Sequence, residues 1–226
     1  MTETAVIVRY CEIHLKGKNR GFFEKLLRVN IEKSLAGIKH KFTAMHSRYL
    51  IEDFSETDYP LICDKLHKIA GVHTFSRAIV VPNNFEKIQD AAALLCKDRT
   101  GTFKIETNRA DKTFYPNSVE TSALIGGKML ELYGKNLKVA VKNADFTVNI
   151  DIREDGKTFV YSETEHGLSG MPVGSAGRGL LLISGGIDIP VAGFMMSKRG
   201  MKIDCIHFHS FPYTGGSGKA EGNKTN

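Results

Sequence analysis

The stretch from Leu180 to Gly193 constrains the fold of this chain more than any other part of the sequence. A short apolar run stops at Ser184-Gly185-Gly186, and a sequence compatible with a helix begins at Pro190. A strand, a tight glycine turn and a helix start collect unpaired backbone N–H groups at the positive end of a helix dipole. The glycines let an anion approach the backbone, and the serine adds a hydroxyl donor. The stretch therefore predicts a phosphate-binding loop in a parallel α/β segment. Asp188 is expected to face Mg²⁺ or a hydrogen-bond donor that orients the nucleotide.

Two observations on the same stretch point the other way. A glycine turn between a strand and a helix also occurs in α/β proteins that bind no nucleotide, so a purely structural turn is the alternative interpretation. In addition, Pro190 suits the first helical position, which predicts that residue 189 is the N-cap. Ile189 has no capping oxygen, which costs about 1 kcal/mol of helix stability and removes a phosphate donor.

Composition limits the class of protein. The 226 residues suffice for one large core or two to three small ones, and no apolar run approaches the length of a membrane span. The four cysteines lie far apart, without metal-ligand spacing. We therefore expect a cytoplasmic protein with free buried thiols, no metal site and no membrane contact.

The first third of the chain has the element order of a ferredoxin-like fold, which is strand, helix, two strands, helix, strand. Asn19 is expected to cap the first helix and Gly37 to end it, and Gly71 is expected to close the second helix at the C′ position. The expected strands are 5–10, 39–45, 48–53 and 72–81, and the second helix is 58–70.

A second α/β unit follows. Its expected helices are 84–97 and 117–133, and its expected strands are 102–108, 138–141, 147–153 and 158–164. Asp155-Gly156 is a hairpin signal between the last two strands. Residues 202–210 are expected to form a strand parallel to the apolar run before Ser184.

Positive charge is concentrated rather than spread evenly. The formal net charge is +6. Two stretches carry most of the clustered cations, namely Lys16, Lys18, Arg20 and Lys25 in the first, and Lys97, Arg99, Lys104, Arg109 and Lys112 in the second. Such stretches suit the phosphates of a nucleic acid, and the alternative interpretation is an ordinary solvated face.

Six short motifs in the right order resemble the ThiI family of tRNA 4-thiouridine synthetases, and together they cover residues 5 to about 214. The motifs are Leu15–Arg20, Gly71–Phe75, Phe103–Arg109, Val148–Arg153, Gly170–Gly174 and the PP-loop pattern Ser184–Asp188. The chain departs from the family at three positions, with Ile189 in place of Ser, Ala144 in place of Pro and Ser169 in place of Gly.

The resemblance implies an α+β protein with an N-terminal ferredoxin-like domain, an α/β THUMP domain and an incomplete, Rossmann-like PP-loop segment. The implied boundaries are 1–75 for the ferredoxin-like domain, 76–166 for the THUMP RNA-binding domain, 167–179 for a linker, 180–214 for the truncated PP-loop ATP pyrophosphatase segment and 215–226 for a flexible tail.

The resemblance also implies function. Family members use ATP with Mg to make 4-thiouridine at tRNA position 8, take sulfur from a cysteine desulfurase, are linked to thiamine thiazole synthesis, and include homodimers. The implied tRNA-binding residues are Lys16, Lys18, Asn19, Arg20, Lys104, Arg109 and Lys112. The implied ATP-binding residues are Leu182, Ile183, Ser184, Gly185, Gly186 and Asp188. His207, Phe208 and His209 are expected to contact adenine or ribose, because ligands bind at the carboxyl ends of strands in an open parallel sheet. The alternative interpretation is that this histidine pair is packing or solvated polar surface.

The polar, glycine-rich tail after Thr214 predicts a truncated chain, because the family's catalytic cysteines lie further on. We therefore assign no catalytic residue, and we expect Cys205 to be a buried structural thiol. The favoured interpretation is a chain that binds tRNA without full catalysis. Two alternatives stay open, namely a transferase completed by a separate polypeptide, and a basic ferredoxin-like module that contacts proteins and has no RNA role.

Overall fold

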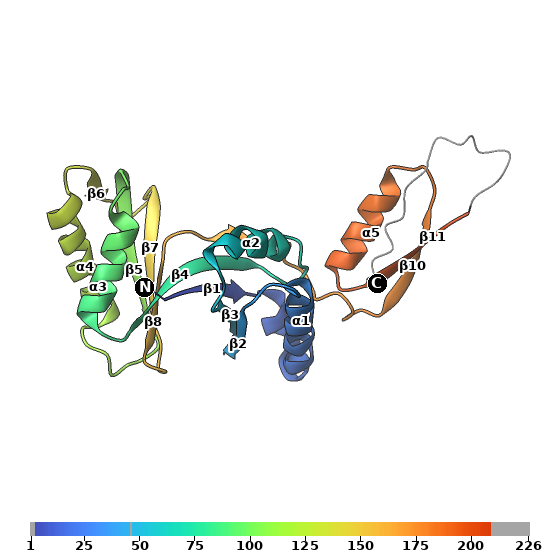
Figure 1. Ribbon diagram of the computed structural model, residues 1–226, viewed down its shortest axis with the longest axis horizontal. Coiled ribbons are helices and arrows are strands. Elements are labelled where there is room, and N and C mark those ends of the chain that lie inside the picture. Colours follow the sequence, from blue (N-terminus) through green and yellow to red (C-terminus); the bar gives the residue numbers. More distant parts are fainter. Residues whose placement is uncertain (1–2, 46, 209–226) are drawn as a thin grey trace.

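The computed structural model describes residues 3–45 and 47–208, and it has an elongated shape in which three units follow one another (Figure 1). A unit with α1 and α2 lies in the middle, a unit with α3 and α4 lies at one end, and a small unit with α5 lies at the other. The expected mixed α/β architecture, with two compact units and a partial parallel sheet, is confirmed.

The middle unit has the predicted ferredoxin-like order, with its four strands antiparallel in the sequence β2-β3-β1-β4. Both helices contribute to one core, which includes Leu27, Leu66 and Phe75. On the opposite face of the sheet, Phe159 of the end unit packs with Ile7 of the middle unit. The elements are β1 Thr4–Arg9, α1 Arg20–Ser34, β2 Lys41–Met45, β3 Arg48–Glu52, α2 Tyr59–His67 and β4 Thr74–Pro82.

The end unit places α3 and α4 over a sheet with parallel and antiparallel pairs. Strand β5 is parallel to both β6 and β7, and β7 and β8 form an antiparallel hairpin at the predicted Asp155-Gly156 turn. Asn117 caps α4 through a complete capping box with Glu120, which decides between the two caps that the sequence offers, Asn117 and Ser118. The elements are α3 Phe85–Cys96, β5 Gly101–Arg109, α4 Ser118–Tyr133, β6 Leu137–Val139, β7 Phe146–Ile152 and β8 Lys157–Tyr161.

Strand β4 belongs to both of these units. It pairs with β1 along residues 74–79 and with β8 along residues 79–82, and the short strand β9 (Glu165–His166) pairs with its first two residues. One continuous sheet of nine described strands therefore runs through the two units. Because the ladder hydrogen bonds are shared, the orientation of one unit fixes that of the other.

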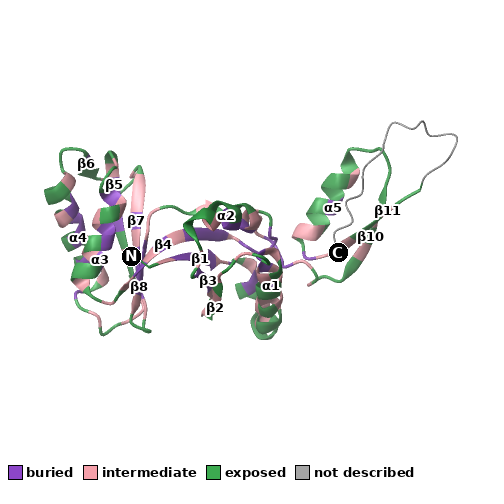
Figure 2. Ribbon diagram, viewed as in Figure 1, coloured by how far each residue is buried: buried purple, intermediate pink, exposed green. Residues whose placement is uncertain are grey.

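The third unit is a two-stranded parallel sheet with one helix. It consists of β10 (Arg178–Ile183), α5 (Asp188–Lys198) and β11 (Lys202–His207). The segment before it is tied to the middle unit, since Ser169 donates its backbone N–H to the Val72 carbonyl and accepts from Gly71. Figure 2 shows that most of this unit is exposed, in contrast to the buried strands of the middle unit. Two strands and one helix cannot cover both faces of a parallel sheet.

Several predicted boundaries are wrong, and the reasons are local. Helix α1 begins after Asn19 as expected, but the Asn19 side chain makes no capping bond and the helix ends at Ser34 rather than Gly37. Helix α2 ends at His67, so Gly71 is not its C′ residue. Gly71 instead has a φ of +103°, and an added Cβ would lie 2.9 Å from the Leu27 side chain. Glycine is required here because the backbone at Gly71 lies very close to the side chain of Leu27 in α1.

A buried ion pair reinforces the junction between the first two units. Arg48 of β3 donates to Asp151 of β7, and their side chains are only 14% and 5% exposed. Arg153 lies 3.6 Å from the other Asp151 oxygen, and Asn108 donates to the same oxygen at 3.5 Å. Removing one partner of a buried pair leaves an uncompensated charge, which is far costlier than losing an exposed pair.

We predict that Arg48→Met lowers the free energy of unfolding by about 3 kcal/mol, because Asp151 then keeps only its longer contacts. The matched control is Arg28→Met, which removes an exposed pair with Glu32 and should cost less than about 1 kcal/mol. Urea denaturation followed by circular dichroism measures both. Equal losses in the two variants would contradict a role for the buried pair at the junction.

We also predict faster amide exchange in the third unit than in the shared sheet. Local opening is easiest where few apolar groups are buried, and β10 and β11 have no fully buried residue, whereas β4 is largely buried. Hydrogen–deuterium exchange with mass spectrometry should show early labelling of 178–207 and late labelling of 74–82. Equal protection of both segments would be inconsistent with this difference.

Candidate RNA-binding surface and nucleotide loop

The first basic segment forms 3-10 turns rather than the expected loop. The turns span Glu12–Asn19 and are interrupted at Gly17, which has a φ of +49°. Lys18 and Asn19 are exposed, and the ammonium of Lys16 lies 5.2 Å from the centre of the Phe23 ring. The segment thus presents two lysines beside the start of α1. Neither lysine is part of a salt bridge among the described residues.

Arg20 has a different environment from these lysines. Its guanidinium donates to Glu24 at 2.7 Å, to Ser47 at 2.9 Å and to the Tyr10 hydroxyl at 3.2 Å. Burial and the hydrogen bond with Glu24 raise the pKa of Tyr10 to about 12. Burial opposes ionisation of Glu24, but hydrogen bonds from Tyr10 and Arg20 outweigh it and lower the pKa of this carboxyl. Arg20 therefore holds the start of α1 against β1 and the turn before β3.

The cations of the second stretch do not form one patch. Lys104 and Arg109 are five residues apart on β5, so their side chains point to opposite faces of the strand. Lys104 contacts Glu106 at 3.3 Å. Arg109 donates to the Phe114 carbonyl, and Lys112 donates to the Arg109 carbonyl at 3.0 Å. Arg109 and Lys112 thus close the loop after β5, and Lys112 stays exposed.

Two further arginines occupy a polar hollow of about 300 Å³ between the first two units. Arg9 donates to Ser76 at 3.0 Å and lies 4.7 Å from the Tyr161 ring centre, while one of its terminal nitrogens is buried without a partner. Burial lowers the pKa of Arg9. Arg48, in its pair with Asp151, lines the same hollow. The sequence analysis did not single out either residue, although each stands at one end of a strand with an apolar centre.

The candidate nucleotide loop, residues 184–188, lies between β10 and α5, as the sequence predicts. All residues from Ser184 to Asp188 are exposed, and nothing lies within 4 Å of a Cβ built on Gly185. Helix α5 begins at Asp188, so the N-cap is Ile187 rather than residue 189. Ile187 makes no side-chain cap, and therefore the first backbone N–H groups of α5 have no capping side chain.

The residues at the end of β11 are only partly described. His207 contacts the Ile183 carbonyl through its ring nitrogen at 2.8 Å, and Phe208 is 70% exposed. His209 lies outside the described residues. The expectation for Cys205 is wrong, because this thiol is exposed. It borders an apolar hollow of about 320 Å³ between the sheet and α5, which Leu181 and Phe194 also line.

The residues of this loop fit the phosphates of a nucleotide. Open glycines and uncapped N–H groups at a helix start are the donors that a phosphate requires. For the rest of the nucleotide, the described part of the unit offers exposed apolar side chains, with Leu182 60% and Ile183 41% exposed. Asp188 is exposed at the first position of α5 and is free to face a cation.

The described residues meet neither the requirements of a membrane-spanning helix nor those of a three-ligand metal site. Within residues 3–45 and 47–208, no helix combines the length and apolar character needed to cross a membrane. The same residues contain no group of three or more His, Cys, Asp or Glu side chains arranged to hold a metal ion.

Three family models match successive parts of the chain. The ThiI ferredoxin-like domain matches residues 5–76, the THUMP domain matches residues 82–163, and the model described as thiamine biosynthesis protein (ThiI) matches residues 174–224. These matches follow the three units of the structure in order.

Relatives and a solved structure agree with these models. A probable tRNA sulfurtransferase of Finegoldia magna is 38% identical to this chain, with 95% of the chain aligned. One of Clostridium kluyveri is 42% identical, with 92% of the chain aligned. The chain spans only about half the length of these relatives, 56% and 54%. A crystal structure of a 4-thiouridine synthetase–RNA complex with bound ATP matches with a TM-score of 0.81 at 35% identity, covering 94% of this chain and 54% of that one. With its ferredoxin-like, THUMP and partial nucleotide-loop units in this order, the chain belongs to the ThiI family.

Proposed function

We propose that this chain is the tRNA-binding portion of an ATP-dependent tRNA sulfurtransferase that makes 4-thiouridine at tRNA position 8. The observation that carries the proposal is the match of the joined ferredoxin-like and THUMP units to the synthetase that was crystallised with RNA. Shared strand β4 sets the relative position of these units, so a surface that spans both is preformed. A preformed surface favours recognition of a folded RNA by shape.

Lysines are the main phosphate contacts in this proposal. Lys16 and Lys18 stand on the middle unit, and Lys104 and Lys112 stand on the end unit, so cations of both units are available. Asn19 is exposed beside them and can donate to a sugar or a phosphate. Arg20 and Arg109 act as positioning residues, since their guanidinium groups hold Glu24 and the Phe114 carbonyl.

The third unit contributes the start of the ATP site in this proposal. Backbone N–H groups of Gly185 and Gly186, with the Ser184 hydroxyl, hold phosphates, and Asp188 faces the accompanying Mg²⁺. ATP supplies the activation of a substrate oxygen, and sulfur comes from a cysteine desulfurase. In this proposal the ferredoxin-like domain ends near residue 75, the THUMP domain ends near residue 166, and the nucleotide-binding segment begins near residue 180.

Exposed apolar side chains indicate what this unit needs in order to catalyse. Leu180, Leu182, Phe194 and Met195 are each at least half exposed, and they lie on a two-stranded sheet and its helix. Burial of such groups yields about 25 cal/mol per Å². We propose that in the active cytoplasmic enzyme this surface is covered by polypeptide that corresponds to the remaining part of the relatives' sequence. The present chain then binds tRNA without full catalysis.

We predict that Lys16→Glu/Lys18→Glu weakens binding to unmodified tRNA at least about tenfold and lowers the slope of log affinity against log salt by about 2, since each phosphate contact contributes about 0.9. Fluorescence anisotropy at several salt concentrations measures both quantities. Binding to a single-stranded RNA of equal length should be weaker than binding to tRNA.

The matched control is Lys33→Glu/Lys39→Glu. It makes the same change in charge, on exposed residues at and beyond the opposite end of α1. Equal effects of the two double variants would mean that only net charge matters. Equal and weak binding of both RNAs would instead support a basic module without an RNA role.

We predict that Gly185→Ala weakens binding of Mg-ATP at least about tenfold without lowering the melting temperature, because the added Cβ has no protein atom within 4 Å and only obstructs the ligand. Isothermal titration calorimetry measures binding, and differential scanning calorimetry measures stability. Gly177→Val is the comparison for stability: its φ of +79° strains any side chain, so this variant should lower the melting temperature and leave ATP affinity unchanged. Unchanged ATP affinity of Gly185→Ala would contradict the proposed role of the loop.

A further inference from the structure

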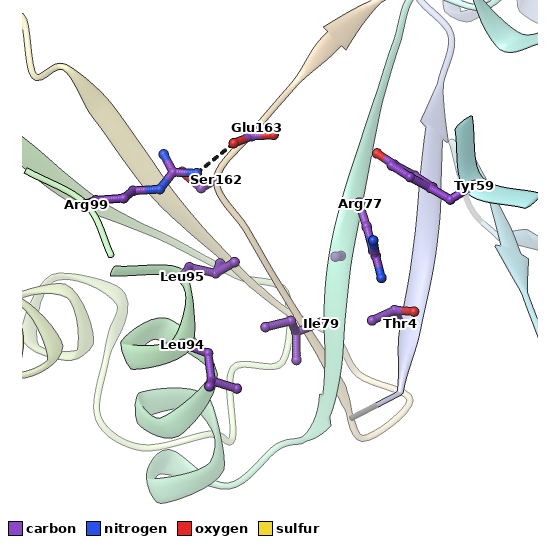
Figure 3. A pocket seen from close by; sticks show the side chains of 10 residues that line it. Thr4, Tyr59, Arg77, Ile79, Leu94, Leu95, Arg99, Ser162 and Glu163 are labelled. Carbon is purple, nitrogen blue, oxygen red and sulfur yellow. Dashed lines mark hydrogen bonds and ion pairs between the residues drawn. The ribbon is translucent and has the colours of Figure 1, made fainter. Parts of the chain in front are cut away.

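A second hollow of about 420 Å³ lies between the helices of the middle unit and those of the end unit (Figure 3). Its position follows from the burial pattern of β4. On the helix-covered face, Phe75 packs into the core of the middle unit and Ile79 packs against the core of the end unit. Arg77 stands between these two residues on the same face, so a charged side chain marks the seam between the two cores.

Two guanidinium groups face this hollow from different units. Arg77 comes from the shared strand and lies 4.8 Å from the centre of the Tyr59 ring. Arg99 follows α3 and lies 4.7 Å from the centre of the Phe146 ring. Figure 3 shows the two arginines on opposite sides of the hollow, with Ile79 and Leu95 between them. Each guanidinium is thus positioned by an aromatic ring, and the lining between them combines apolar side chains with the polar side chains of Ser162 and Glu163.

The carboxylates that now pair with these arginines are easily displaced. Arg77 pairs with Glu56, whose side chain is 67% exposed, and Arg99 pairs with Glu163, whose side chain is 80% exposed. Exposed ion pairs contribute little to stability, and an exposed glutamate recovers its hydration when it swings away. The arginines themselves are less exposed, at 35% and 29%. A ligand carboxylate or phosphate can therefore replace each glutamate at small cost.

We propose that this hollow binds a small organic dianion with an acidic group at each end of an apolar body. Planar guanidinium groups recognise carboxylates and phosphates with two parallel hydrogen bonds. The apolar floor of Ile79, Leu94 and Leu95 accepts the body of the ligand. The volume is within the range of small-molecule sites, which combine an apolar lining with a few polar groups that fix orientation. The site is separate from the nucleotide loop, which lies in the third unit.

The test uses terephthalate as the probe, with terephthalamide as its neutral analogue and benzoate as its single-acid analogue. The whole chain is labelled with ¹⁵N-arginine, and side-chain Nε–H resonances are followed during titration. Terephthalate should shift the resonances of Arg77 and Arg99, and it should bind more tightly than benzoate. Terephthalamide should not bind. Failure of terephthalate to shift these two resonances, or equal binding of terephthalamide, would overturn the proposal.

Variants make the test sharper, because the arginine variants and the glutamate variant should change terephthalate affinity in opposite directions. Arg77→Met and Arg99→Met should each weaken terephthalate binding about tenfold or more, and Glu163→Gln should strengthen it by removing a competitor. Arg28→Met is the matched control, since Arg28 also pairs with an exposed glutamate and also lies over a ring, that of Phe42 at 5.6 Å. Unchanged affinity in both arginine variants, or an equal loss in the control, would show that the hollow is not the site. Circular dichroism confirms that each variant folds.

Discussion

The shared strand β4 is the constraint on which the rest of the structure depends. Its nine residues pair with β1 at one end and with β8 at the other, so hydrogen bonds of a single strand hold two cores together. A flexible linker would let the two units reorient, whereas a continuous ladder does not. The buried pair of Arg48 and Asp151 adds a side-chain link across the same junction. Every surface that needs residues of both units, whether for RNA or for a small anion, inherits its geometry from this strand.

The third unit is attached by a different principle. No described strand of the large sheet pairs with β10 or β11, and the connection is made by backbone hydrogen bonds of the segment before β10. Gly200 accepts from Gly174 and Ala176, and an added Cβ at Gly170 would meet the Lys198 carbonyl at 2.2 Å. The connection is therefore closely packed although the unit itself buries little. The position of the nucleotide loop is consequently set by the linker, while its stability requires cover on the apolar faces.

Local patterns predicted the elements well and the long-range contacts poorly. The order of strands and helices, the Asn117 cap and the Asp155-Gly156 hairpin follow from periodicity and turn chemistry, which act over a few residues. A loop was expected at residues 16–20, where the structure has 3-10 turns and the start of α1, and Gly71 was expected to end a helix. Glycine serves several geometries that the sequence alone does not distinguish. The exposure of Cys205 depends on how much of the sheet is covered, which is a tertiary property. The hollow with Arg77 could not be predicted, since its two arginines lie on elements that only the folded sheet brings together.

The basic residues of this chain differ in their environment, because some donate to protein groups whereas others are exposed to solvent. Several arginines near the junction donate to an intramolecular partner through the guanidinium group, whose planar donors have a fixed geometry. These arginines are Arg9, Arg20, Arg48, Arg77, Arg99 and Arg109. Lys18 instead stands exposed on a flexible side chain and has no salt-bridge partner among the described residues, so its compact ammonium ion exchanges hydration for a phosphate without loss of an ion pair. In the proposed RNA-binding surface, the free charge is therefore set mainly by lysine and the shape by arginine, and the two contributions respond differently to salt.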